Sequence, residues 1–247
     1  SNPNPACSAA CPIHVNARGM LAAVAKADFA AGFKLYSRTA PLPRILSRIC
    51  DQPCRAACKR GEVGGGVEIR QLEQACVEFQ AEATKKPLPA VKKPRRIAIV
   101  GGSLAGLTAA ADLASKGYPV TIFEAAERLG GRLWDYDERV LPRQLMEMEF
   151  AALVQLGVAV VWRSLVQDNG AVSCDSLLAD YDAVFMALTA SRCCDSPITV
   201  DPDTQATGRE KLFGGLPPPD SPIQQVLQGR IAAISIDRSL QGASLTA

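Results

Sequence analysis

The chain has 247 residues, with 27 Lys and Arg against 25 Asp and Glu, and a formal net charge of +2. This balance and an aromatic content of 5% argue against a surface for nucleic acid or an anionic membrane. No apolar run reaches the ~18 residues of a membrane span. The first residues, Ser1-Asn2-Pro3, are not typical of a signal peptide, so a cytoplasmic protein is expected.

Five of the nine cysteines form two groups near the start of the chain. Cys7 and Cys11 form a C-x3-C-P pattern, and Cys50, Cys54 and Cys58 form C-x3-C-x3-C. The odd count and the missing secretion signal argue against a disulfide framework. Thiolates bind soft metals, so the groups predict zinc or an iron–sulfur cluster. The third spaced cysteine and the Cys-Pro pair favour one [4Fe–4S] cluster.

The other cysteines, Cys76, Cys174, Cys193 and Cys194, are isolated or merely adjacent, and we expect core or surface thiols there. His14 is the only histidine and is expected to be a packing or solvent residue. No catalytic residue is predicted.

Helical patterns surround the second cysteine group. Residues 17–33 and 67–82 carry apolar residues at helical spacing. Residues 83–96 contain three prolines and six basic residues, which predicts a semi-extended linker. We therefore expect a helical iron–sulfur domain at 1–82, a linker at 83–96, and an α/β domain at 97–247.

The α/β part begins with a strand–turn–helix–strand pattern. Residues 97–100 are an apolar run suited to a buried parallel strand, and a Gly-rich turn follows at 101–106. An Ala/Leu-rich helix then runs to Lys116 and ends at Gly117, before a second strand at 120–123. This order predicts a Rossmann-like βαβ unit.

Three positions of the turn correspond to a G-x-G-x-x-G dinucleotide motif. The first glycine allows a tight turn, a small middle residue lets the backbone approach the pyrophosphate, and the last glycine lets helix and strand pack closely. Gly101, Ser103 and Gly106 occupy these positions, and Glu124 lies where an acid binds a ribose hydroxyl. The unit is therefore expected to hold a dinucleotide, FAD in the first place.

Ser103 replaces the middle glycine of that motif. Its hydroxyl could reach a phosphate, but its Cβ narrows the approach. The alternative interpretation is an ordinary βαβ turn that binds nothing.

Taken together, these motifs resemble the small subunit of glutamate synthase, the flavin part of dihydropyrimidine dehydrogenase and NADPH:ferredoxin oxidoreductases. The resemblance also uses the segments Val67-Glu-Ile-Arg-Gln-Leu-Glu73, Leu129-Gly-Gly-Arg132, Tyr181-Asp-Ala-Val-Phe-Met-Ala187 and Leu212-Phe-Gly-Gly215. It implies a helical iron–sulfur domain followed by a single Rossmann-like FAD-binding domain. The residues expected around FAD are Gly101, Ser103, Leu104, Ala105, Gly106, Glu124, Gly131, Arg132, Ala187 and Gly215.

The first-choice cluster ligands are Cys11, Cys50, Cys54 and Cys58, with Cys7 as the competitor. Glu73 is a weaker candidate, because some relatives use a Gln side chain as a ligand at the matching position.

The departures from the family are also informative. Its first cysteine motif has two more thiols upstream of Cys7, which puts a second cluster in doubt. The family inserts an NAD(P)H domain where this chain has only the dozen residues 188–199, without glycine. Leu216 replaces an Asp that contacts the flavin's ribityl–phosphate region, and Thr189 replaces a glycine. Both replacements weaken the case for tight FAD binding.

These observations predict an electron-transfer subunit of a larger hetero-oligomeric oxidoreductase. It would relay electrons between FAD, a [4Fe–4S] cluster and partners such as a catalytic subunit or a ferredoxin-like subunit. Two alternatives remain open: a degenerate adaptor without flavin, and an NAD(P)H oxidoreductase whose nicotinamide domain is missing or lies on another chain.

Overall fold

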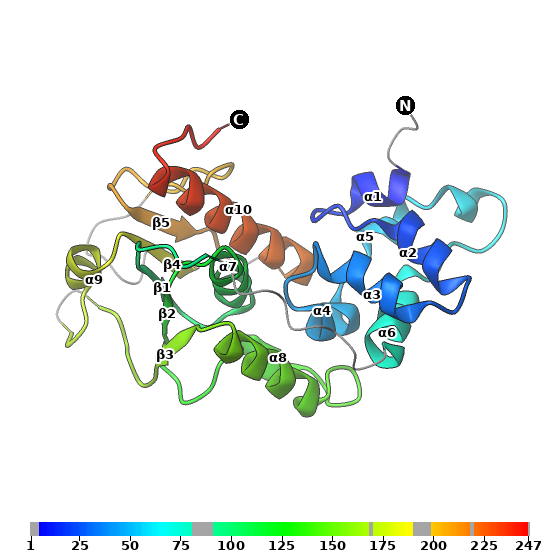
Figure 1. Ribbon diagram of the computed structural model, residues 1–247, viewed down its shortest axis with the longest axis horizontal. Helices are drawn as coiled ribbons and strands as arrows, with labels where there is room; N and C mark the ends of the chain where they lie inside the picture. Colours follow the sequence, from blue (N-terminus) through cyan, green and yellow to red (C-terminus); the bar gives the residue numbers. More distant parts are fainter. Residues whose placement is uncertain (1–4, 81–90, 168–169, 190–198, 218–219, 247) are drawn as a thin grey trace. The chain divides into compact units, whose positions relative to one another are not determined.

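The computed structural model describes residues 5–80, 91–167, 170–189, 199–217 and 220–246 (Figure 1). It divides into two compact units. The helical unit consists of Ser1–Leu88, Glu138–Met146 and Ser221–Gln224, and the sheet unit consists of Pro89–Asp137, Glu147–Asp220 and Gln225–Ala247. The domain boundaries expected from the sequence stay a prediction. Most of the expected linker, and residues 190–198 where the family carries its insertion, lie outside the described residues.

The helical unit is built from short helices that begin at polar caps or prolines. The Asn16 side chain accepts a hydrogen bond from the Gly19 N–H, and Asp28 accepts one from the Ala31 N–H, so each opens a helix. Pro43 and Pro53 each occupy the first helical position of another. The elements are α1 (Ala6–Ala10), α2 (Ala17–Val24), α3 (Phe29–Ser37), α4 (Pro43–Ile49), α5 (Pro53–Ala56), the 3-10 helix η1 (Lys59–Glu62) and α6 (Ile69–Phe79).

The helical pattern at 17–33 is confirmed only in part, because two helices share it. The chain breaks after α2 at Ala27, whose φ is +57°, and the Asp28 cap then starts α3. The second expected pattern corresponds to α6, which ends at Phe79. The core between these helices includes the fully buried side chains of Met20 and Tyr36.

The sheet unit contains five parallel strands in the order β3-β2-β1-β4-β5. The strands are β1 (Ile97–Val100), β2 (Val120–Phe123), β3 (Ala159–Val161), β4 (Ala183–Thr189) and β5 (Leu212–Gly215). The two strands expected from the sequence, at 97–100 and 120–123, are confirmed. The strand order reverses between β1 and β4, and in such sheets ligands bind outside the carboxyl ends at this switch point.

Helices pack against this sheet, α7 against β1, β2 and β4 and α9 against β4. The helices that follow β1 in the chain are α7 (Leu104–Ser115), the 3-10 helix η2 (Gly131–Asp135), α8 (Arg143–Gln155), α9 (Cys174–Asp180) and α10 (Pro222–Leu240). The expected helix up to Lys116 is confirmed as α7, with Gly117 at φ +89° directly after its cap. Ala98 and Val184 share a buried cluster with Leu177 of α9. The α/β class is therefore as expected.

Close packing holds α10 against α7, which lie side by side in Figure 1. A Cβ at Gly229 would lie 2.3 Å from the Ala105 carbonyl oxygen, so only glycine allows this approach. Beside it, Arg230 Nε lies 3.3 Å from Asp112 Oδ2.

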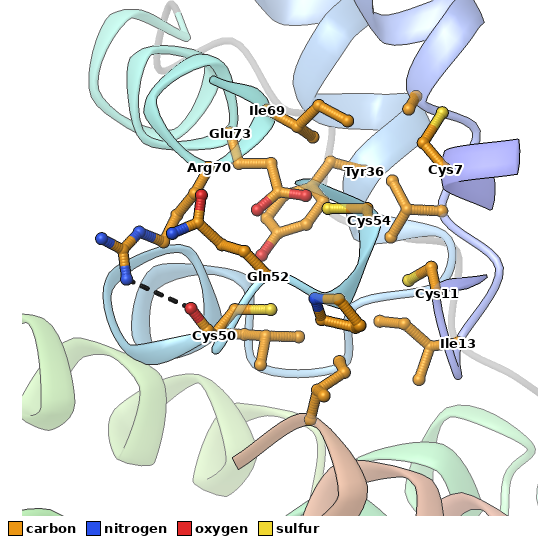
Figure 2. A pocket seen from close by; sticks show the side chains of 15 residues that line it. Cys7, Cys11, Ile13, Tyr36, Cys50, Gln52, Cys54, Ile69, Arg70 and Glu73 are labelled. Atoms are coloured by element: carbon orange, nitrogen blue, oxygen red, sulfur yellow. Dashed lines mark hydrogen bonds between the residues drawn. The ribbon is translucent and has the colours of Figure 1, made fainter. Parts of the chain in front are cut away.

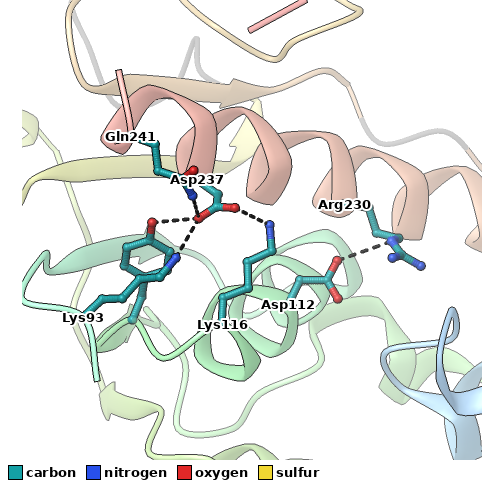
Figure 3. A network of polar contacts seen from close by, with 7 residues as sticks. Lys93, Asp112, Lys116, Arg230, Asp237 and Gln241 are labelled. Atoms are coloured by element: carbon teal, nitrogen blue, oxygen red, sulfur yellow. Dashed lines mark hydrogen bonds and ion pairs between the residues drawn. The ribbon is translucent and has the colours of Figure 1, made fainter. Parts of the chain in front are cut away.

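A polar network fixes the far end of α10 (Figure 3). Asp237 Oδ1 accepts hydrogen bonds from Lys93 Nζ at 3.0 Å and from the Tyr118 hydroxyl at 2.7 Å, and its Oδ2 accepts one from Lys116 Nζ at 2.7 Å. The donors precede β1 or lie between α7 and β2, so one carboxylate ties the last helix to the start of the sheet.

Within the described ranges, no helix combines the length and the apolar character that crossing a bilayer requires.

Candidate iron–sulfur and dinucleotide sites

A cavity in the helical unit is lined by four of the five grouped cysteines (Figure 2). Cys7 of α1, Cys11 directly after α1, Cys50 at the end of α4 and Cys54 of α5 all line it. Glu73 of α6 lines the same cavity and is only 7% exposed. Residues spread over more than sixty positions of sequence thus face one space.

The local chain path explains how Cys50 and Cys54 reach the same cavity. Helix α4 ends at Ile49, and the ψ of 130° at Cys50, its C-cap, turns the backbone out of the helix. Gln52 then adopts a left-handed conformation with φ +57°, and Pro53 starts α5 at once. Arg70 Nη1 donates a hydrogen bond to the Cys50 carbonyl oxygen at 3.1 Å, which ties this turn to α6.

Burial disfavours the charged forms of the acidic groups in this cavity. Burial raises the pKa of the Cys50 thiol to about 12 and that of the Cys54 thiol to about 11. Burial also raises the pKa of Glu73 to about 8, although the charge of Arg70 opposes the shift. The Glu73 carboxyl accepts no hydrogen bond from any described residue. Buried acidic groups of this kind become stable as anions when a metal supplies the countercharge.

The number of thiols at this cavity is the number that one [4Fe–4S] cluster takes. Four of them, Cys7, Cys11, Cys50 and Cys54, line it. Among the described residues, no group of three His, Cys, Asp or Glu side chains is placed to hold a single metal ion.

Cys58, one of the first-choice ligands, does not line this cavity. It lines a second depression together with Cys7, Arg18 and Lys59. Hydrogen bonds from backbone N–H groups, that of Val67 first, lower the pKa of its thiol. Cys7 lines both spaces, so the structure favours Cys7 over Cys58 at the cavity, and the ligand set stays a prediction.

The remaining residues singled out in the sequence are the isolated cysteines and His14. Cys76 and Cys174 are fully buried, as expected of core thiols, whereas Cys193 and Cys194 lie outside the described residues. His14 is exposed, and its Nδ1 lies 3.1 Å from the Ser8 carbonyl oxygen.

The Gly-rich turn in the sheet unit requires its glycines. Gly101 has φ +96°, a conformation that side chains disfavour. A Cβ at Gly106 would lie 2.1 Å from the Gly101 carbonyl oxygen, so this position allows the close approach of α7 to β1. Gly102 is less restricted, because a Cβ there would lie 2.6 Å from Leu129 Cδ2, the end of a flexible side chain.

Ser103 and Glu124 both bond to this turn. The Ser103 hydroxyl accepts a long hydrogen bond of 3.4 Å from the Gly106 N–H and donates one of 3.2 Å to the Ala187 carbonyl oxygen. Glu124 Oε2 accepts a hydrogen bond of 2.6 Å from the Gly102 N–H. The turn after β1, Glu124 after β2 and Ala187 of β4, all expected to contact the cofactor, are therefore adjacent.

The other expected cofactor residues are placed as follows. Leu104 and Ala105 form the buried first turn of α7. A Cβ at Gly215 would lie 3.1 Å from the Met186 carbonyl oxygen, so β5 and β4 lie close together at this residue. Gly131 and Arg132 lie in η2, where the Arg132 guanidinium is 75% exposed and 3.8 Å from Asp220.

The cavity residues that were not predicted from the sequence include Gln52 and Arg70. Gln52 has the left-handed conformation, and Arg70 Nη1 donates to the Cys50 carbonyl oxygen, yet neither residue type is a usual metal ligand. Arg70 could have been found from its position one helical turn before Glu73, which places both side chains on the same face of α6.

Comparisons with known proteins agree with this geometry. Residues 2–85 match the model of the dihydropyrimidine dehydrogenase domain II, 4Fe-4S cluster. Residues 99–166 match the model of the NAD(P)-binding Rossmann-like domain. The chain is homologous to the glutamate synthase small subunit and its relatives. The resemblance expected from the sequence is thus confirmed, and so is the 4Fe–4S domain.

Three relatives illustrate the homology. The NADP(+)-dependent formate dehydrogenase subunit beta of Moorella thermoacetica is 30% identical over 205 residues, which cover 73% of this chain and 29% of the relative. The NADPH-Fe(3+) oxidoreductase subunit beta of Geobacter sulfurreducens is 29% identical over 194 residues, covering 75% and 28%. The glutamate synthase [NADPH] small chain of Bacillus subtilis is 27% identical over 158 residues, covering 63% and 32%. The chain therefore spans less than two thirds of each relative.

Proposed function

We propose that the chain is an electron-transfer subunit of a larger oxidoreductase complex, with one [4Fe–4S] cluster in the helical unit and FAD in the sheet unit. The observation that carries the proposal is the cavity lined by four thiols and a buried carboxyl group. The matched 4Fe-4S model and the names of the relatives, which are subunits of oxidoreductases, support it.

In the helical unit, Cys11, Cys50 and Cys54 would hold the cluster, and the fourth ligand is either Cys7 or Glu73. Both candidates line the same cavity as the other three thiols. Binding releases the thiol protons, so the raised pKa values of Cys50 and Cys54 make assembly dependent on pH.

In the sheet unit, the start of α7 would face the pyrophosphate, and Glu124 would bind a ribose hydroxyl. Two backbone N–H groups, of Gly102 and Ala126, already hold the Glu124 carboxylate in place. A carboxylate has lone pairs left for a hydroxyl donor after accepting two such bonds. FAD, when bound, exchanges two electrons and releases them singly, as a one-electron cluster requires.

Partners would supply and remove the electrons, which makes the protein a hetero-oligomer. The names of the Moorella and Geobacter relatives, each a subunit beta, support this assembly. The short segment at 188–199 supports electron entry through a partner protein, because a nicotinamide domain of ~100 residues does not fit there.

A second candidate is a nicotinamide site at the same Gly-rich turn. The model matched by residues 99–166 is described as NAD(P)-binding, which favours it. Direct reduction of the purified chain by NADPH would support this function over the relay.

The deciding experiment is anaerobic purification followed by iron, sulfide, zinc and flavin analysis, with identification of co-purifying chains. We expect about four irons per chain and a flavin absorption band at about 450 nm. Zinc without iron would refute the electron-transfer function. Iron without the flavin band would favour the adaptor.

A further inference from the structure

Ser103 bridges the place at which the proposed dinucleotide would bind. Its hydroxyl donates to the carbonyl oxygen of Ala187, near the carboxyl end of β4, at 3.2 Å. It also accepts from the Gly106 N–H, in the first turn of α7, at 3.4 Å. One hydroxyl thus connects the two sides of the β1–β4 switch point.

There is little room beside this bridge. A Cβ placed on Gly106 would lie 3.0 Å from Ala187 Cβ, so α7 and β4 already approach each other closely. The Gly102 N–H is bonded to Glu124 Oε2 at 2.6 Å. Two N–H groups at the beginning of α7 and its turn are therefore satisfied from within the chain.

We propose that Ser103 is an internal latch: its hydroxyl holds the Gly-rich turn to β4 in the nucleotide-free chain and must be displaced when a dinucleotide binds. The latch rests on the proposed function, and it makes Ser103 the residue that sets affinity at this site. A phosphate oxygen competes with the hydroxyl for the Gly106 N–H and gains a charge-assisted bond in exchange.

The backbone at this position allows a clean test. Ser103 has φ −69° and ψ 170°, an extended conformation that Gly and Ala adopt equally well. Ser103→Ala removes the two hydrogen bonds of the hydroxyl group and keeps the Cβ. Ser103→Gly removes the two hydrogen bonds and the Cβ as well. Comparing the two variants separates the latch from simple crowding by the Cβ.

The experiment is an equilibrium titration of the full chain, freed of flavin, with FAD and separately with ADP. We expect both variants to bind each ligand about tenfold more tightly, the size of one hydrogen bond. The nucleotide-free S103A chain should also unfold at a lower temperature, because Ser103 caps α7. Ser173→Ala is the matched control: Ser173 caps α9 in the same way, so this variant loses stability without gaining affinity.

The outcomes distinguish the latch from the proposed FAD relay. Tighter binding by S103G alone would overturn the latch and leave crowding as the cause. Weaker binding by S103A would overturn it too, since the hydroxyl would then be a phosphate donor. If the natural chain binds no FAD and the variants do, the latch stands and the proposed FAD relay falls. If no chain binds either ligand, both proposals are wrong.

Discussion

Glu124 Oε2 accepts a hydrogen bond from the Gly102 N–H at 2.6 Å, although 22 residues separate the two. Oε1 of the same carboxylate accepts one from the Ala126 N–H at 2.8 Å. The acid that was expected to bind a ribose hydroxyl thus also organises the turn that faces the pyrophosphate.

Glu124→Gln should therefore weaken both the fold and nucleotide binding. The amide nitrogen of Gln repels one of the two N–H donors, so the free energy of unfolding should fall by about 1–2 kcal/mol in urea denaturation. Glu127→Gln is the matched control, because the Glu127 side chain is 72% exposed and pairs with Arg163 at the surface. Equal losses in both variants would contradict the structural role of Glu124.

Gly106→Ala should disrupt the contact between the Gly-rich turn and α7. The added Cβ would lie 2.1 Å from a backbone carbonyl oxygen that cannot move aside. We expect a loss of about 3 kcal/mol or more, measured by thermal or urea unfolding. Gly208→Ala is the control, because a Cβ there meets no atom within 4 Å. A stable G106A chain would show that the turn is looser than the structure shows.

Asp237→Asn should destabilise the sheet unit in a pH-dependent way. Burial alone would raise the pKa of Asp237, but hydrogen bonds from Lys116, Tyr118 and Lys93 outweigh it and hold the pKa well below its usual range. The carboxylate therefore stabilises the fold above the unfolded-state pKa of about 4, and this contribution is lost as the pH falls through the lowered folded-state pKa.

At pH 7 we expect the asparagine variant to lose about 2 kcal/mol relative to the natural chain. The difference should shrink when urea unfolding is repeated at about pH 3, where protonation of the carboxylate begins to remove the same stabilisation. Asp203→Asn, at an exposed residue, should show neither effect. A difference that is constant with pH would mean that the charge of Asp237 contributes nothing.

Serine substitutions should show whether the cluster binds at the cavity or at the second depression. Cys50→Ser and Cys54→Ser should each lower the iron content by more than half, because both thiols line the cavity. Cys58→Ser should retain the iron, since Cys58 lies at the other depression. Cys76→Ala is the control, a buried thiol of α6 that does not line the cavity.

The fourth ligand can be assigned in the same series. If Glu73 is the ligand, Glu73→Gln should change the electron paramagnetic resonance spectrum of the reduced cluster, and Cys7→Ser should leave it unchanged. The reverse result assigns Cys7. If C58S loses its iron and C7S keeps it, the fourth ligand is Cys58, and the assignment made from the cavity is wrong.

Local patterns were sufficient to predict the βαβ unit. An apolar run, a Gly-rich turn, an Ala/Leu-rich helix and Gly117 specify that unit within a few residues of each other, and the structure has its strands at the expected positions. The break at Ala27 was not predicted, because Ala favours helices and the left-handed conformation there depends on its surroundings.

The sequence by itself determined the domain types and the strands at 97–100 and 120–123, and it predicted which residues would bind a cluster or a dinucleotide. Those features depend on residue type and short spacing. Only the tertiary structure decided which thiols share a cavity, that Glu73 is buried among them, and that the Ser103 hydroxyl reaches Ala187. These relationships join positions far apart in the chain, and they follow from how helices and strands pack.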